Sequence, residues 1–347
     1  MRAVTIVHVA EKAGVSLKTV SRVLNNEPNV TPQTRDRVMA AVDELGYSPS
    51  MAARRMGGSR SYLLIAFNDR QLTLDNWRSE RGNNWIDQML YGAMLRCERS
   101  GYHLLFELID LQSDGLERRV TAILSSLQPD GVILTPPNSE NETVLRVLRK
   151  REIPFVRVGS SARGAGHKVY MDDRAAGEAV TRHLLELGHR KIGFISGSPR
   201  FQASLQRAEG YATAMAASGV NRHEAWVQPG DFTYESGLAA ADALLALEDR
   251  PTAIMASNDE MALAALHVAQ RLGIAVPADL SIVSFDDSPG VRFSVPPLTA
   301  VRQPTAEMAE RAADILIAAS AEGGKPATSR HQLPFELIVR GSSGRAN

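Results

Sequence analysis

The chain contains a single cysteine, Cys97, and lacks any run of the ~18 apolar residues that a membrane span requires. One cysteine cannot form an internal disulfide, which is typical of proteins from a reducing compartment. The first residues include a short apolar stretch, but His8 and Glu11 interrupt it, so we expect no secretory signal. These absences favour a cytoplasmic protein with no membrane partner.

Motifs of common enzyme sites are also missing. The sequence has no GxxxxGK[ST] phosphate loop, no HExxH, no GxSxG and no CxxC pair. Its eight histidines show no metal-ligand spacing, and we expect His189, in the segment LGH, to satisfy local backbone groups. The sequence therefore predicts no catalytic residue, no metal and no cofactor.

The composition is that of a globular protein with two or three domains. Apolar residues make up 44% and charged residues 22% of the 347 positions. The formal net charge is zero but unevenly distributed, because residues 1–60 carry nine Lys/Arg and five Asp/Glu, a net +4, against −4 for residues 61–347. A basic N-terminal segment suits a partner that carries phosphates.

Residues 4–25, VTIVHVAEKAGVSLKTVSRVLN, predict two short helices joined at Gly14. The apolar stripe of the first helix is Val4, Ile6, Val9, Ala10 and Ala13. Ser16 is the expected N-cap of the second helix, and its inward stripe is Val20, Val23 and Leu24. The opposite face fits the DNA major groove and consists of Leu17, Lys18, Ser21, Arg22 and Asn25. The alternative is an ordinary helical hairpin.

A third helix is predicted after Val30, with Thr31 as its N-cap, Pro32 at its first position and Gly46 at its end. Its inward stripe is Val38, Ala41, Val42 and Leu45. Three small helices of this kind form a compact DNA-binding head, which we assign to residues 1–47.

These motifs carry a resemblance to a known family. The segment above, followed by NVTPQTRDRVMAAVDELGYSPSMAARRM, resembles the head and hinge of the lactose-repressor family of bacterial transcription regulators. The most specific motifs are AEKAGVSxxTVSRVLN and LGYxP. The resemblance implies DNA contacts by Ser16, Leu17, Lys18, Thr19, Ser21, Arg22, Asn25, Thr34, Tyr47, Ala53 and Met56.

The resemblance also implies a hinge at residues 48–60. In the family, this segment becomes a helix when two subunits lie side by side on DNA, and an apolar side chain then wedges into the minor groove. By position that side chain is Met56, where leucine is usual. The alternative is a flexible basic linker.

From residue 61 onward strands and helices alternate, which predicts parallel sheets covered on both faces. Strands are expected at 62–67, 102–108, 131–135 and 155–158, and in a second set at 191–196, 226–228, 253–256 and 281–284. The predicted fold class is α/β: a small all-α helix-turn-helix head plus two doubly wound parallel-sheet lobes, like those of periplasmic binding proteins. We assign residues 61–160 with 290–321 to the N-terminal lobe, and 161–289 with 322–341 to the C-terminal lobe.

Polar residues and one aromatic follow many of these strands, where ligands of such sheets bind. The segments LGHRKIGFISG, ASNDEMA, VPADLSIVSFDD and PPLTAVRQP resemble effector-domain signatures of the family, whose resemblance extends to residue 340. It implies an effector site of Asp69, Trp85, Ile86, Thr135, Arg157, Arg207, Phe232, Asn258, Asp286 and Gln303. Polar groups that suit vicinal hydroxyls, with Phe232 as an aromatic wall, favour a sugar or glycoside. For each residue a helix N-cap or similar structural role is the alternative.

Two features depart from the family pattern. Arg157 stands at the position where many sugar-responsive members carry an aspartate, so it either recognises an anionic group on the effector or pairs with a nearby acid. Residues 70–82, RQLTLDNWRSERG, are longer than the usual connection. They are either a disordered insertion or a lid that favours a larger ligand such as a disaccharide.

The sequence thus predicts a ligand-responsive regulator, a repressor by preference, that binds palindromic double-stranded operator DNA as a homodimer. A small molecule in the cleft between the lobes controls this binding. A dimer is expected because the C-terminal segment FELIVRGSSGRAN lacks a heptad tail. The alternatives are a solute-binding sensor and a regulator that responds to a sugar acid through Arg157.

Overall fold

The computed structural model describes residues 4–24, 27–47, 60–78, 84–220, 223–323 and 326–347. The chain divides into two compact units, residues 1–62 and residues 63–347. The predicted DNA contacts Asn25, Ala53 and Met56, and the hinge at 48–59, lie outside the described residues.

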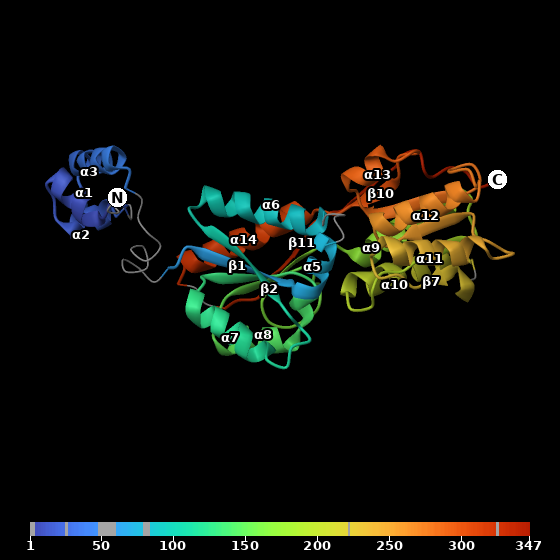
Figure 1. Cartoon of the computed structure of the whole chain (residues 1–347), viewed down its shortest axis with the longest axis horizontal. Helices are drawn as coiled ribbons and strands as arrows, with labels where there is room; N and C mark the ends of the chain where they lie inside the picture. The colour runs from blue at the N-terminus through green and yellow to red at the C-terminus, as the bar shows by residue number, and fades with distance from the viewer. Residues whose placement is uncertain (1–3, 25–26, 48–59, 79–83, 221–222, 324–325) are drawn as a thin grey trace. The chain divides into compact units, whose positions relative to one another are not determined.

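The first unit is the predicted three-helix head, and its helices are α1 (Ile6–Ala13), α2 (Leu17–Leu24) and α3 (Pro32–Leu45) (Figure 1). Gly14 and Gly46 end α1 and α3 with φ of 62° and 58°, a backbone region that glycine enters at little cost. The Thr31 hydroxyl accepts a hydrogen bond from the Thr34 amide, which confirms the predicted N-cap of α3. Val4 does not belong to the apolar stripe, because it precedes the helix and is exposed.

The first lobe of the second unit is built on one six-stranded sheet in the order β11-β5-β4-β3-β1-β2, with all pairs parallel. Its strands are β1 (Leu63–Asp69), β2 (His103–Ile109), β3 (Gly131–Leu134), β4 (Phe155–Val158), β5 (His167–Tyr170) and β11 (Arg330–Gln332). Its helices are α5 (Arg70–Arg78), α6 (Asn84–Arg99), α7 (Leu116–Leu127), α8 (Glu142–Lys150) and α14 (Thr305–Ala321), with the short 3-10 helix η1 (Asn138–Glu140) after β3. Helices α7 and α8 cover one face of this sheet, and α6 and α14 cover the other (Figure 1).

The second lobe has a six-stranded sheet in the order β12-β10-β9-β8-β6-β7. Its strands are β6 (Ile192–Ile195), β7 (Val227–Gln228), β8 (Ala253–Ala256), β9 (Ser281–Asp286), β10 (Thr299–Arg302) and β12 (Glu336–Ile338), the last of them antiparallel to β10. Its helices are α9 (Asp173–Glu186), α10 (Gln202–Ala217), α11 (Tyr234–Leu245), α12 (Asp259–Arg271) and the short α13 (Pro289–Phe293), with η2 (Glu224–Trp226) before β7. Helices α9 and α10 pack on one face, and α11 and α12 pack on the other.

The lobe boundaries predicted from the sequence assign three strands to the wrong sheet. Strand β5 belongs to the first sheet, where it pairs with β4, although residues 161–289 were assigned to the second lobe. Strand β10 pairs with β9 of the second sheet, and β11 pairs with β5 of the first. The chain therefore crosses between the lobes after β5, after β10 and after β11. The sequence pattern of a strand cannot predict these crossovers, because a short buried strand has the same apolar pattern in either sheet.

Residues 70–78, which follow β1, form a helix. The alternative of a disordered insertion is therefore excluded for these residues. Helix α5 follows β1 directly, and Trp77 packs on Phe106 of the edge strand β2 with 6.0 Å between ring centroids. Residues 79–82 of the predicted insertion lie outside the described residues. None of the helices in the described ranges combines the length and apolar character of a membrane span.

Candidate functional sites

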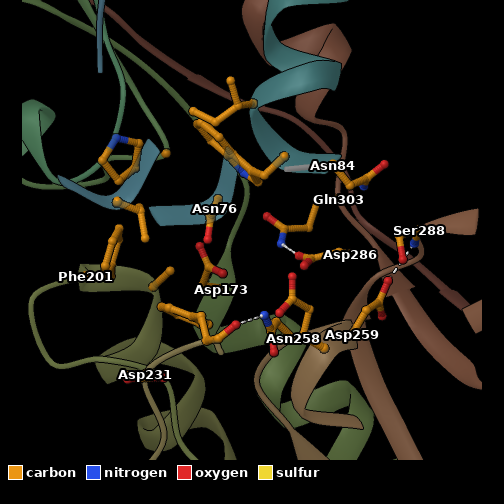
Figure 2. A pocket seen from close by; sticks show the side chains of 18 of the residues that line it. Asn76, Asn84, Asp173, Phe201, Asp231, Asn258, Asp259, Asp286, Ser288 and Gln303 are labelled. Carbon is orange, nitrogen blue, oxygen red and sulfur yellow. Dashed lines mark hydrogen bonds between the residues drawn. The ribbon is translucent and has the colours of Figure 1, made fainter. Parts of the chain in front are cut away.

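A cavity of about 660 Å³ lies between the two lobes of the second unit, at the carboxyl ends of the parallel strands (Figure 2). This volume lies within the ~300–1,000 Å³ of small-molecule sites. The first lobe supplies residues from α5, α6 and η1, and the second lobe supplies the starts of α9, α10, α11 and α12. The cleft that strand order predicted is therefore present.

Seven of the ten residues predicted to bind the effector line this cavity. They are Trp85, Ile86, Arg207, Phe232, Asn258, Asp286 and Gln303. They come from distant points of the chain and converge because parallel strands end at one edge of each sheet.

The other three predicted residues, Asp69, Thr135 and Arg157, do not line the cavity. The Thr135 hydroxyl is buried and donates to the Phe67 carbonyl at 3.0 Å. Asp69 caps α5, because its Oδ1 accepts the Leu72 amide at 2.8 Å.

Arg157 lies inside β4. Gly159, which directly follows this strand, lines the cavity. It is 3% exposed, and its Nε and Nη1 donate to the carbonyls of Ser139 and Arg163 at 2.6 and 3.2 Å. Its Nη2 binds Glu140 Oε2 at 2.6 Å. Of the two roles that the sequence left open for Arg157, the structure shows pairing with a nearby acid.

Arg207 is held by Asp173, a residue that the sequence analysis did not single out. Arg207 Nε and Nη2 each lie 2.8 Å from Asp173 Oδ1, and Nη1 donates to the Ser257 carbonyl at 2.6 Å. The guanidinium carbon also lies 4.3 Å from the centre of the Phe285 ring. Burial, the largest effect, raises the pKa of Asp173, and the charge of Arg207 opposes this rise. The pair therefore presents a preorganised donor to the cavity.

Close packing of two helices brings this pair together. A Cβ atom at Gly177 of α9 would lie 2.6 Å from the Arg207 carbonyl oxygen, and one at Gly210 of α10 would lie 2.2 Å from that of Arg174. Only glycine permits this approach, so these two positions determine how near α10 comes to α9.

Asp286 and Gln303 point at each other in the cleft, and the Gln303 amide nitrogen donates to Asp286 Oδ1 (Figure 2). Burial, followed by the nearby charge of Asp259, raises the pKa of Asp286 to about 8. Burial also raises the pKa of Asp259 to about 6, although it accepts hydrogen bonds from Ser284 and from the Ser288 amide. A carboxyl that is protonated at neutral pH can donate as well as accept, which suits an uncharged hydroxyl.

The aromatic wall consists of Phe232 and Phe201, whose rings meet edge to face with 5.3 Å between centroids. Phe232 has φ of 75°, which is uncommon for a bulky side chain and typical of functional positions. Asn258 holds this conformation, because its Nδ2 donates to the Phe232 carbonyl at 2.8 Å while its Oδ1 accepts the Met261 amide at 3.0 Å as the N-cap of α12. Asn258 therefore caps α12 and lines the cavity at the same time.

Several lining residues escaped sequence analysis. They are Leu72, Asn76, Ser139, Glu140, Asp173, Arg200, Phe201 and Tyr234. Asp173 could have been noticed, because it follows the N-cap Asp172 of α9 at a strand end. The pattern around Ser139 and Arg200 offers no such signal, because they lie in irregular connections whose path depends on tertiary packing.

The outer face of α2 carries the predicted DNA-reading side chains. Leu17 and Lys18 are exposed, and Arg22 is half-buried, with its Nε 3.6 Å from Glu27 Oε2. The Ser16 hydroxyl accepts the Thr19 amide at 3.2 Å, which confirms it as a capping residue. Ser21 is half-buried on the same helix.

Tyr47, another predicted DNA contact, packs its side chain into the core of the head. It is 7% exposed and belongs to the cluster of Val9, Val20 and Val38, and burial raises its pKa. Its ring is therefore mainly a packing group. Thr34 remains half-buried in the first turn of α3, where it hydrogen-bonds Thr31.

Comparisons with known proteins agree with this architecture. Residues 5–50 match the family model "Bacterial regulatory proteins, lacI family", and residues 181–343 match "Periplasmic binding protein-like domain". The HTH-type transcriptional regulator reg1 of Streptomyces lividans is 36% identical over 351 residues, which cover 97% of this chain and 96% of reg1.

Solved structures show the same arrangement. A transcriptional regulator CelR–cellobiose complex superposes with a TM-score of 0.73 at 30% identity, and covers 98% of this chain and 100% of that one. The lac repressor dimer bound to operator and the anti-inducer ONPF superposes with a TM-score of 0.81 over 99% and 100% of the two chains, and at 24% identity it supports the fold alone. The chain therefore belongs to the lacI family of bacterial regulatory proteins, as a non-enzymatic, ligand-responsive transcriptional regulator with a DNA-binding and an effector-binding domain.

Proposed function

We propose that this protein is a repressor that binds a palindromic operator as a homodimer and that a sugar or glycoside in the cleft controls its grip on DNA. The observation that supports this most is the composition of the cavity. The aromatic residues Trp85 and Phe232 line the same cavity as the polar residues Arg207, Asn258 and Asp286. Operator binding would place the protein in the cytoplasm.

This mixture suits a saccharide for a physical reason. The C–H faces of a sugar ring pack on aromatic side chains, and its hydroxyls donate and accept hydrogen bonds in the ring plane. A solved structure of the related CelR is a complex with cellobiose, and the present cavity is large enough for a drug-sized ligand. A disaccharide is therefore the first class to test.

The response follows from the crossovers between the lobes. A ligand that contacts both lobes stabilises one closure angle, and the closure angle sets the spacing of the two hinge segments in a dimer. Such coupling between two sites is typically ~1–3 kcal/mol and is reciprocal, so operator DNA changes effector affinity by the same factor.

The dimer has support in the surface of α6. Tyr91 and Met94 lie three residues apart on this helix and are 58% and 55% exposed. Neighbouring exposed hydrophobic residues favour burial in a partner. Two heads related by a two-fold axis require an operator of matching symmetry.

Two measurements test the proposed function. Neutral disaccharides should raise the apparent melting temperature by mass action. The full chain should bind a palindromic duplex with an affinity that falls as salt rises, and a chain lacking residues 1–60 should not bind it. If no saccharide stabilises the protein, or if the shortened chain binds DNA equally well, the proposal is wrong.

We do not propose a sugar-acid effector bound through Arg157, because this residue does not line the cavity and its charge is paired with Glu140.

A further inference from the structure

One corner of the cavity contains buried polar atoms that the protein itself leaves unused. Ser139 and Glu140 belong to η1, which follows β3 in the first lobe, and both line the cavity. Ser139 is 1% exposed, and its hydroxyl has no hydrogen-bond partner among the described residues. Glu140 Oε1 is likewise buried without such a partner within the described ranges. Buried polar atoms are almost always hydrogen-bonded, so this corner is suited to a ligand.

Arg157 fixes both residues of this corner, although it does not line the cavity itself. It binds the Ser139 carbonyl and Glu140 Oε2, which are atoms other than the two without a partner. Lys168 donates its ammonium group to the carbonyls of Gly164 and Gly166. Arg157 and Lys168 are therefore engaged by protein oxygens, and Arg157 acts as a positioning residue.

The cavity as a whole has a surplus of acidic side chains. Seven acidic residues line it, with Glu140 among them and with Asp286 protonated at neutral pH, against two arginines, Arg200 and Arg207. Arg207 pairs with Asp173, and Arg200 pairs with Asp69. Asp231 carries a charge in addition, because hydrogen bonds from Thr233 and Ser236 lower its pKa although burial opposes them. An anionic ligand would lose its hydration and meet a surplus of carboxylates.

We propose that Ser139 and Glu140 form a subsite that receives a hydroxyl or ammonium group of the effector, so that the cleft admits uncharged and aminated saccharides but rejects sugar acids and sugar phosphates. This inference rests on the proposed function, because it specifies the chemistry of the same effector. Glu140 Oε1 accepts from the ligand, and the Ser139 hydroxyl donates or accepts according to the group it meets.

Matched ligands test the charge selectivity. Cellobiose, maltose and lactose are compared by calorimetry with their uronic acids, in which a carboxylate replaces one CH2OH group and both rings stay closed. Cellobiose is also compared with the β-1,4-linked disaccharide of glucosamine. We expect each acid to bind at least about tenfold more weakly than the neutral parent, since one unpaired buried charge costs that much or more. If no saccharide of any charge binds, the proposed function fails. If an acid binds as tightly as its neutral parent, this inference fails and the proposed function stands.

Variants test the subsite itself. Glu140→Gln and Ser139→Ala should each lower affinity for the neutral ligand, by about tenfold for the charged acceptor. Glu140→Gln should also reduce the difference in affinity between the acid and its neutral parent, which a merely structural defect would not do. The matched control is Glu142→Gln, because Glu142 pairs with Arg149 on the surface and does not line the cavity. Unchanged affinity in Ser139→Ala, which keeps the ion pair of Arg157, would overturn the subsite.

The role of Arg157 has a separate readout. Arg157→Met should weaken the neutral ligand in the wild-type background and have little further effect in Glu140→Gln, because both act on one group. Melting temperature without ligand and operator affinity of the effector-free protein show whether each variant is folded. Additive losses would show that Arg157 does not act through Glu140.

Discussion

Asp69 of the first lobe and Arg200 of the second are joined by an ion pair between the lobes, with 3.3 Å between Asp69 Oδ2 and Arg200 Nη2. The other carboxylate oxygen of Asp69 caps α5 through the Leu72 amide. One buried carboxylate thus connects the wall of the cavity to the opposite lobe. Although Asp69 does not line the cavity, it is placed to influence lobe closure.

Asp69→Asn should weaken effector binding severalfold without unfolding the protein. Because Arg200 is 50% exposed, solvent screens the pair, and we expect it to contribute about 0.5–1 kcal/mol. Calorimetric titration with the saccharide that binds measures this loss. Asp75→Asn, which alters an exposed carboxylate of α5, the helix that Asp69 caps, is the control. Equal affinities of the two variants would show that the pair does not stabilise the closed cleft.

Asp286→Ala should abolish the response to the effector and leave operator binding intact. Its carboxyl lies in the cavity with Gln303, whereas the head forms a separate unit. Gel-shift titrations with and without the saccharide measure both properties. A variant that still responds normally would show that the effector binds elsewhere.

The same residue predicts a pH dependence of stability. The pKa of Asp286 is raised from 3.8 to about 8, so between these values the folded state retains a proton that the unfolded chain releases. The free energy of unfolding therefore falls as pH rises, by about 1.4 kcal/mol per pH unit for one proton, and this loss ends above the raised pKa. Asp259, with its pKa raised to about 6, adds to the slope at lower pH.

Urea denaturation between pH 6 and pH 9 measures this effect. Asp286→Asn should show a shallower decline than the wild type up to pH 8, since its amide does not titrate. Asp242→Asn, at an exposed position, should retain the wild-type slope. Identical slopes in wild type and Asp286→Asn would contradict the raised pKa of Asp286.

Arg22→Ala should reduce discrimination between operator sequences by ~1–3 kcal/mol if this arginine pairs with a guanine. Arg22 now pairs with Glu27, which is half-exposed, so this ion pair is weak and competes little with a guanine for Arg22. Fluorescence anisotropy with operators altered at single base pairs measures discrimination. Arg37→Ala, on the exposed face of α3, removes the same charge and should leave base preference unchanged. Equal discrimination by both variants would remove Arg22 from the base-reading set.

Gly210→Ala should destabilise the second lobe by about 1–3 kcal/mol, because the new Cβ would overlap the backbone of Arg174 and force the helices apart. Since Arg207 lies on the same helix, effector affinity should fall as well. Thermal unfolding and calorimetry measure the two effects. Gly115→Ala is the control, because its nearest neighbour would be 3.5 Å away and its φ is −92°. A neutral effect at Gly210 would mean that α9 and α10 can separate freely.

The sequence by itself determined the local structure of this protein and the class to which it belongs. Local signals act within one or two helical turns, so the sequence predicts them without a structure. Examples are the capping residues Ser16 and Thr31 and the apolar stripes of α2 and α3. The polar residues at strand ends also predicted most of the cleft, because parallel strands necessarily present those ends together.

Tertiary structure alone decided where the lobes exchange strands and which polar groups are free for a ligand. Strand β5 joins the first sheet and β10 joins the second through pairings between distant segments, which no local pattern encodes. Arg157 was expected in the cleft, yet its side chain turns to Glu140. Burial and hydrogen-bond partners are properties of the packed chain. They place Ser139 and Glu140, rather than Arg157, in the wall of the cavity, with one polar atom of each left without a partner among the described residues.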